Sequence, residues 1–164
     1  MIELIGVPFD LCGHRYGSRL GPSAVRFAGL VPTLEAQGLE VKDGGDLPVV
    51  EESTEQGGLR NFPPLLQTIE ALQARVGKVF DAGATPLVLG GDHSCVLGAV
   101  SAALKRFDDD LAVLWIDAHA DLNTPVTSPS GNIHGMPMAA LLGMNCKIGG
   151  PKCAEWEHLL SVVG

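Results

Sequence analysis

Apolar residues along the chain fall into short runs that alternate with segments of helical periodicity. An unbroken apolar run is typical of a strand covered on both faces, whereas apolar residues at every third or fourth position indicate one buried helix face. The runs predict strands at residues 2–7, 39–41, 86–89 and 111–116. The periodic segments predict a helix that begins at G-P-S-A-V-R-F-A-G-L and two more at residues 65–82 and 94–107.

Proline and glycine positions support the predicted helix ends. Pro22 falls in a first helical turn, where its missing N–H costs nothing, and Gly83 follows residues 65–82 as a favourable C-cap. Residues 43–63, rich in glycine, proline and acidic side chains, are predicted to form a long surface loop.

The order of the predicted elements is β-α-β-α-β-α-β, which implies parallel strands joined by helical crossovers. We therefore expect an α/β fold with a doubly wound sheet. The chain has 164 residues, of which 46% are hydrophobic, and this suits one globular domain with a substantial core.

The charge balance and the apolar runs bear on whether the protein binds nucleic acids or membranes. The chain carries 11 Lys and Arg against 19 Asp and Glu, a formal net charge of −8, with no basic tract. This disfavours a nucleic-acid partner. No window reaches the roughly 18 apolar residues that a membrane span requires, and the residues after Met1 do not resemble a signal peptide. We expect a cytoplasmic protein without a membrane partner.

The four cysteines, Cys12, Cys95, Cys146 and Cys153, show neither a C-x-x-C motif nor zinc-ribbon spacing. An even number would also fit disulfides in a secreted protein. With a cytoplasmic location expected, we predict reduced thiols that act as small hydrophobic residues.

Ionisable residues follow two of the predicted strands directly. Residues 86–89 run into G-G-D-H-S, and residues 111–116 run into D-A-H-A-D. Ligands of parallel α/β sheets bind beyond the carboxyl ends of the strands. In extended backbone Asp117, His119 and Asp121 would point to one side, and His93 could join them from the neighbouring strand end.

This mixture of carboxylate and imidazole suits Mn, Fe, Zn or Ni, and a bridging carboxylate would hold two ions about 3.5–4 Å apart. Asp and His at a strand end can also serve only to cap loops, but the two blocks together favour a metal site. For Asp92 we expect a carboxylate that orients the loop rather than a ligand. His134, on the polar loop after Asp121, could shuttle protons, although a lone loop histidine is often merely exposed.

The blocks G-G-D-H-S, D-A-H-A-D-L-N-T-P and S-G-N-I-H-G-M-P resemble the signature motifs of the ureohydrolase family, and within it those of the arginases. G-V-P-F-D and G-P-S-A-V-R-F-A-G-L are similar to its amino-terminal motifs, so the resemblance covers about residues 1–143. It implies a three-layer α/β/α fold with a mainly parallel sheet. It also implies hydrolysis of L-arginine to L-ornithine and urea by a hydroxide that bridges two Mn²⁺ ions, in a homo-oligomer, either a trimer or a hexamer.

The resemblance also implies a metal role for four residues. His93, Asp117 and Asp121 would bind one manganese ion. His119 and Asp117 would bind the other, with Asp117 as the bridge, and Asp121 would count among the catalytic residues.

Substrate roles fall on the loop that follows. By the same resemblance, Asn123, Ser128 and Ser130 would contact the α-carboxylate of the substrate, with Asn132 near its α-amino side. His134 would be the catalytic proton shuttle and part of the substrate site.

The sequence departs from the family pattern in one respect. Residues 1–164 do not contain the family's later S-x-D-x-D-x-x-D-P block, which holds further metal ligands, and residues 144–164 match no motif. We expect one domain that corresponds to the amino-terminal part of an arginase, apparently truncated, with residues 144–164 as an unassigned tail. Three functions stay open: an arginase, a ureohydrolase for another guanidino compound, or a non-catalytic remnant that acts in binding or oligomerisation.

Overall fold

Three parallel strands form the sheet in the computed structural model, which describes residues 1–14, 16–53, 58–147 and 149–164. The strands are β1 (Ile2–Val7), β2 (Val41–Asp46) and β3 (Thr85–Gly90), in the order β2-β1-β3. The central strand β1 pairs with β3 from Ile2 opposite Thr85 to Val7 opposite Gly90. This strand is buried along nearly its whole length, as predicted, including Glu3, whose carboxylate pairs with Lys42 and Arg75.

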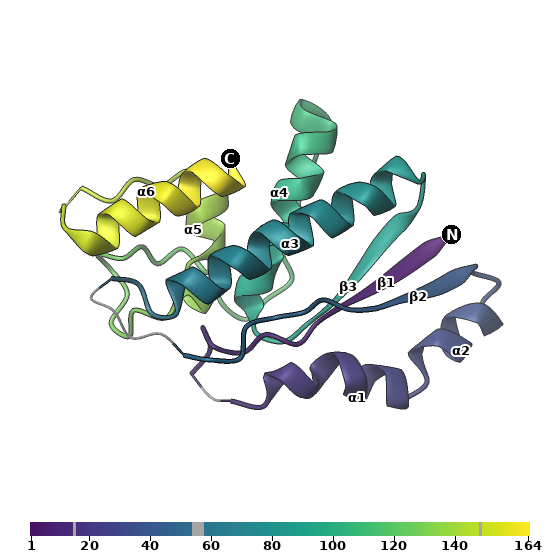
Figure 1. Ribbon diagram of the computed structural model, residues 1–164. Coiled ribbons are helices and arrows are strands. Elements are labelled where there is room, and N and C mark those ends of the chain that lie inside the picture. Colours follow the sequence, from purple (N-terminus) through teal and green to yellow (C-terminus); the bar gives the residue numbers. More distant parts are fainter. Residues whose placement is uncertain (15, 54–57, 148) are drawn as a thin grey trace.

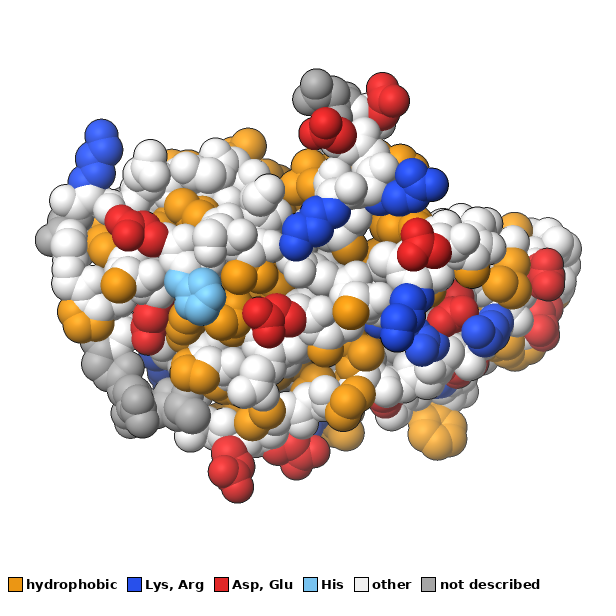
Figure 2. Space-filling view, turned by 45° about the horizontal axis from the view of Figure 1, so that its top comes forward, with side chains coloured by type: hydrophobic (Ala, Val, Ile, Leu, Met, Phe, Trp, Pro, Cys, Tyr) orange, Lys and Arg blue, Asp and Glu red, His pale blue; other side chains and the backbone are white. Residues whose placement is uncertain are grey.

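Helices cover both faces of the sheet, which gives the three-layer α/β/α arrangement (Figure 1). One layer holds α1 (Gly21–Phe27) and α2 (Leu30–Ala36), and the other holds α3 (Phe62–Asp81) and α4 (Val96–Phe107). Two further helices, α5 (Pro137–Leu141) and α6 (Pro151–Val163), pack beside α4. Short 3₁₀ turns cover the ranges Ser18–Leu20, His93–Cys95, Asp108–Asp110 and Ile133–Gly135. Acidic, basic and hydrophobic side chains are interspersed on the face of the molecule shown in Figure 2. None of the helices in the described part of the chain combines the length and apolar character that crossing a membrane requires.

The main core lies between α3 and the elements on either side of it. The apolar positions predicted for this helix, among them Leu65, Ile69, Leu72 and Val76, are fully or almost fully buried. Gly98 lets α4 approach closely, because a Cβ at that position would lie 2.9 Å from both the Ile69 carbonyl oxygen and the Leu72 Cβ. The predicted helices are thus confirmed, with ends shifted by a few residues.

The second strand lies later than the sequence pattern suggests. It was expected at residues 39–41 but spans Val41–Asp46, so it enters the predicted surface loop. Arg26 of α1 explains how acidic residues join a strand there, because its guanidinium lies 2.7 Å from the Asp43 carboxylate and 2.6 Å from that of Asp46. An edge strand also tolerates glycine and charge better than a central one.

The prediction of a buried strand at residues 111–116 is wrong. The segment has no strand structure, and Leu114 and Ile116 are 85% and 87% exposed. An apolar run indicates suitability for burial, but a strand also needs a neighbour that completes its backbone hydrogen bonds. No strand in the described residues pairs with this segment, which instead borders an apolar groove of about 370 Å³ together with α3, β3 and α4.

The expectation that all four cysteines are reduced is also wrong for two of them. Cys146 and Cys153 form a disulfide, with Cα atoms 5.5 Å apart, because the chain after α5 folds back against the first turn of α6. Cys12 and Cys95 are free and buried, in agreement with the prediction.

Residues 144–164 join the main core through α6. The indole of Trp156 is fully buried and donates a hydrogen bond of 2.7 Å to the Met144 carbonyl. Leu159 and Val163 are buried on the same helix. This segment therefore packs with α3, α4 and α5 rather than standing apart from them.

Candidate metal centre

His93, Asp117 and Asp121 converge just beyond the carboxyl end of β3. Each offers one ligand atom, and these atoms all lie within 4.8 Å of one another. The Nδ1 atom of His93 is 3.0 Å from Asp117 Oδ2, and its Nε2 atom is 3.7 Å from Asp121 Oδ2. Three of the four predicted metal ligands thus come together, at the edge of the sheet where parallel α/β folds bind their ligands.

The Asp121 carboxylate is the deepest part of this cluster. The residue is only 8% exposed, and its Oδ2 atom is buried with no hydrogen-bond partner among the described residues. Its backbone has φ 50°, a left-handed conformation that is uncommon outside glycine and clusters at functional sites. A buried anionic oxygen without a donor is costly unless a cation neutralises it, so the arrangement fits a metal ion.

His119 lies beside this cluster rather than in it. Its side chain is 81% exposed, and its Nδ1 atom is 3.2 Å from Asp117 Oδ1. The backbone N–H of His119 also donates to Asp117 Oδ1 at 2.8 Å. This N–H is the main reason that the pKa of Asp117 is lowered; burial opposes it, and the side chains of His119 and His93 add to it.

Asp92 orients the loop that carries His93, as expected. Its carboxylate accepts hydrogen bonds from the Cys12 N–H at 2.8 Å, from the Ser94 N–H at 2.9 Å and from the Ser94 hydroxyl. Burial raises the pKa of Asp92, and these donors partly offset that effect. Gly91 is required beside it, because a Cβ there would overlap the Phe9 backbone.

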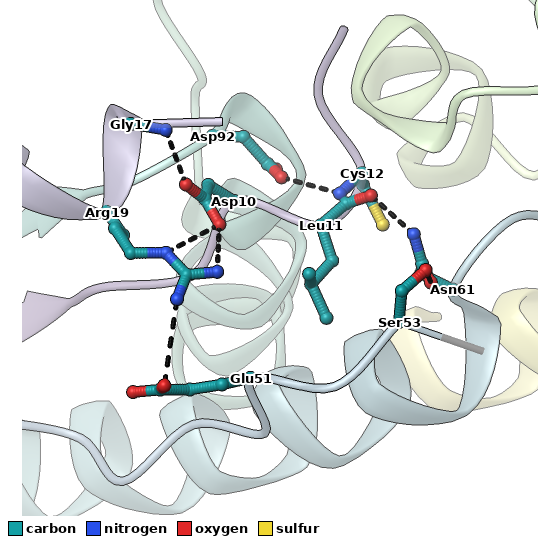
Figure 3. A network of polar contacts seen from close by, with 9 residues as sticks. All are labelled: Asp10, Leu11, Cys12, Gly17, Arg19, Glu51, Ser53, Asn61 and Asp92. Carbon is teal, nitrogen blue, oxygen red and sulfur yellow. Dashed lines mark hydrogen bonds and ion pairs between the residues drawn. The ribbon is translucent and has the colours of Figure 1, made fainter. Parts of the chain in front are cut away.

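A second polar network holds the loop after β1 (Figure 3). The Asp10 carboxylate accepts from the Arg19 guanidinium at 2.6 Å and from the Gly17 N–H at 2.7 Å. On the other side of this loop, Asn61 donates to the Leu11 carbonyl at 2.6 Å, and Ser53 donates to Asn61 at 2.8 Å. Together with Asp92, these contacts tie three loops into one framework near the start of α3.

Most predicted substrate residues bond to their own loop. The hydroxyl of Ser128 accepts from the Gly131 N–H at 3.0 Å, and that of Ser130 accepts from the Asn132 N–H at 3.2 Å. Asn123 accepts from the Thr127 hydroxyl at 3.2 Å. His134 is half-buried in the 3₁₀ turn Ile133–Gly135, which packs against the turn that contains His93. The loop and the candidate metal ligands are therefore neighbours.

Sequence reasoning missed two residues at this loop, Arg60 and His14. Arg60 Nη1 donates to Asn132 Oδ1 at 3.1 Å, and the Asn132 Nδ2 atom lies 3.3 Å from His14 Nδ1. Asn132 itself is only 2% exposed. The partners lie 72 and 118 positions from Asn132 in the sequence, and neither belongs to a recognisable motif, so no local signal points to them.

The fold and the site together define an α/β domain that could hold a metal ion at the carboxyl edge of a parallel sheet. Comparison with known proteins makes this specific: the sequence model of the arginase family matches residues 1–155. The chain belongs to the arginase family.

Individual relatives agree with this assignment. The arginase of Bacillus caldovelox is 46% identical over 171 residues, covering 98% of this chain and 56% of the relative. The arginase of Bacillus subtilis (strain 168) is 46% identical over 144 residues, covering 87% of this chain and 48% of the relative. The solved structure of the Bacillus caldovelox enzyme superimposes with a TM-score of 0.81, over 94% of this chain and 51% of that one. The chain thus spans about half the length of the curated relatives it matches.

Proposed function

We propose that the protein acts as an arginase-type ureohydrolase, which hydrolyses L-arginine to L-ornithine and urea in the presence of Mn²⁺. The observation that carries this proposal is the convergence of His93, Asp117 and Asp121, in which the buried Asp121 Oδ2 atom has no hydrogen-bond partner among the described residues. The names of the relatives supply the reaction class, since both curated proteins described above are arginases.

His93, Asp117 and Asp121 would hold one Mn²⁺ ion, and His119 with Asp117 would contribute to a second. One carboxylate shared between two ions is a common arrangement in hydrolytic sites, and Asp117 suits it because both of its oxygens already face histidines. When bound, such ions supply Lewis-acid stabilisation of negative charge and make water acidic enough to react near neutral pH.

The polar loop would bind the amino-acid end of the substrate. Asn123, Ser128 and Ser130 would contact the α-carboxylate, and Asn132 would lie close by. Fixing that end sets how far the guanidinium group extends, so the length of the substrate determines whether the guanidinium carbon reaches the metal ligands. His134 would hold and pass the proton that the leaving amine requires.

The test is urea release from L-arginine by the protein, with Mn²⁺ added and after removal of metal with a chelator. A panel of guanidino compounds, including agmatine, separates an arginase from a ureohydrolase for another substrate. We expect Mn²⁺-dependent urea release that is greatest with L-arginine. Urea release from no member of the panel, at any Mn²⁺ concentration, would contradict the proposal.

Assembly into a homo-oligomer is part of the same proposal, and sedimentation velocity measures it directly. We expect a trimer or a hexamer. A monomer at every concentration would contradict the proposed oligomer but not the proposed activity.

A further inference from the structure

The side-chain amide of Asn132 is held from two sides by residues from distant parts of the chain. Arg60, just before α3, donates to its Oδ1 atom at 3.1 Å. His14, on the loop after β1, lies with Nδ1 3.3 Å from its Nδ2 atom. Asn132 is almost completely buried, whereas Arg60 and His14 are exposed residues, so the buried amide depends on these two contacts for its hydrogen bonds.

Arg60 determines which way this amide faces. A carboxamide can rotate by half a turn and exchange its acceptor oxygen for its donor nitrogen with little change in shape. A guanidinium has only donors, so it can satisfy only the oxygen. With Arg60 in place, Oδ1 must face Arg60 and Nδ2 must point away from it, toward His14. His14 can accept only one of the two Nδ2 hydrogens.

The position of Arg60 is itself fixed by its neighbours. The Leu59 N–H donates to the Glu155 carboxylate of α6, and a Cβ at Gly58 would overlap that carboxylate. The carbonyl of Arg60 accepts from the Cys12 thiol at 3.8 Å. The next residue, Asn61, is bonded to the loop after β1 (Figure 3). A helix from residues 144–164 therefore helps to support a contact to the candidate substrate loop.

We infer that Arg60 is a positioning residue that sets the Asn132 amide so that it presents N–H donors to the substrate. This inference rests on the proposed function. Donors suit an acceptor such as a carboxylate, whereas an ammonium group offers only donors. It refines the expectation that Asn132 lies near the α-amino side. Arg60 would thereby favour guanidino compounds that end in a carboxylate over those that end in an amine.

The first experiment observes the amide itself. In ¹⁵N-labelled protein, the two side-chain N–H signals of Asn132 are assigned by their loss in Asn132→Asp. We expect Arg60→Gln to shift both signals and to accelerate their exchange with water by about tenfold or more, because a charge-assisted hydrogen bond is lost. Arg60→Lys, which keeps a group that can only donate, should retain the wild-type amide orientation. The matched control is Arg106→Gln, an exposed arginine on α4 that stacks on Phe107. Identical Asn132 signals in Arg60→Gln and Arg106→Gln would overturn the inference.

The second experiment compares L-arginine with agmatine, which lacks the carboxylate, by titration in the presence of Mn²⁺. We expect L-arginine to shift the Asn132 signals, and Arg60→Gln to weaken L-arginine binding about tenfold while leaving agmatine unchanged. Equal weakening for both compounds would mean a general structural role and would overturn the inference. If wild-type protein neither binds L-arginine nor releases urea, the proposed function fails. The Asn132 signals of the first experiment still decide the role of Arg60 in that case.

Discussion

The Nδ1 atom of His93 lies 3.0 Å from Oδ2 of Asp117, although the two residues follow different elements of the fold. His93 is in the turn after β3, and Asp117 follows the exposed segment 111–116. The same two residues belong to the group that could hold a metal ion. A cation at this point would replace a histidine–carboxylate contact that already holds both side chains in place.

Removal of either partner should therefore abolish Mn²⁺ binding. We expect no measurable binding in His93→Ala or Asp117→Ala, because each loses one of three converging ligands and Asp117 is also the proposed bridge. Isothermal titration calorimetry with MnCl₂ measures this. His158→Ala is the matched control, since His158 is exposed on α6 and contacts Phe62 outside the site. Unchanged affinity in both site variants would rule out this ligand set.

His119→Ala should behave differently from these two variants. Because His119 is mostly exposed and lies outside the three-residue cluster, we expect its loss to weaken only a second, weaker Mn²⁺ binding event. Complete loss of all Mn²⁺ binding would show that His119 belongs to the principal site.

Asp121→Asn should have different effects on the free energy of unfolding without metal and with Mn²⁺ present. Without metal, the substitution removes a buried charge that lacks a donor, so the free energy of unfolding should stay equal or rise by about 1 kcal/mol. With Mn²⁺ at a hundredfold excess over its dissociation constant, wild-type protein should gain about 2.7 kcal/mol, and the variant should gain nothing.

Urea denaturation of chelator-treated protein, with and without MnCl₂, measures both the free energy of unfolding without metal and its increase with Mn²⁺. Asp81→Asn, at the exposed end of α3, is the control and should gain as much from Mn²⁺ as wild type. Equal Mn²⁺ stabilisation of Asp121→Asn and wild type would contradict a ligand role for Asp121.

The Asp10–Arg19 pair should make the fold sensitive to acid. Burial by itself raises the pKa of Asp10, but the Arg19 guanidinium and the Gly17 N–H outweigh it, so the pKa is lowered overall. The ionised carboxylate therefore stabilises the fold above the unfolded-state pKa of about 3.9, and this contribution disappears as the pH falls through the folded-state pKa.

Asp10→Asn should cost about 1–3 kcal/mol at neutral pH and should flatten the loss of stability below about pH 4. Chemical denaturation between pH 3 and pH 7 tests this, with the exposed Glu70→Gln as the control. The same acid dependence in wild type and Asp10→Asn would show that the pair contributes no pH-dependent stability.

The exposed apolar segment 111–116 should promote self-association. Leu114 lines an apolar groove, both Leu114 and Ile116 are mostly exposed, and exposed apolar surface of this kind is prone to aggregation. We expect Leu114→Ser combined with Ile116→Thr to lower concentration-dependent light scattering without lowering the melting temperature. Phe27→Ser is the control, since Phe27 is 93% exposed at the end of α1, away from the groove. An equal decrease in scattering from Phe27→Ser would mean that the segment has no special role.

Local patterns in the sequence determined which segments form buried strands and helices in much of this protein. The mainly apolar residues of β1 and the helical periodicity of α3 each predict burial correctly, because the spacing of buried positions in a strand or helix is visible within a few residues of sequence. The placement of His93 directly after β3 also followed, since strands of a parallel sheet end at the same edge. The sequence therefore assigns His93 correctly to this edge of the sheet, whereas the strand expected before Asp117 does not form.

Only the tertiary structure decided which of these residues meet and what else joins them. It separates His119 from the cluster, pairs Cys146 with Cys153, and leaves residues 111–116 without a partner strand. It also brings Arg60 and His14 to Asn132. These outcomes depend on contacts between segments that are distant in the sequence. Local periodicity indicates which residues are buried, but it does not indicate which other segment buries them.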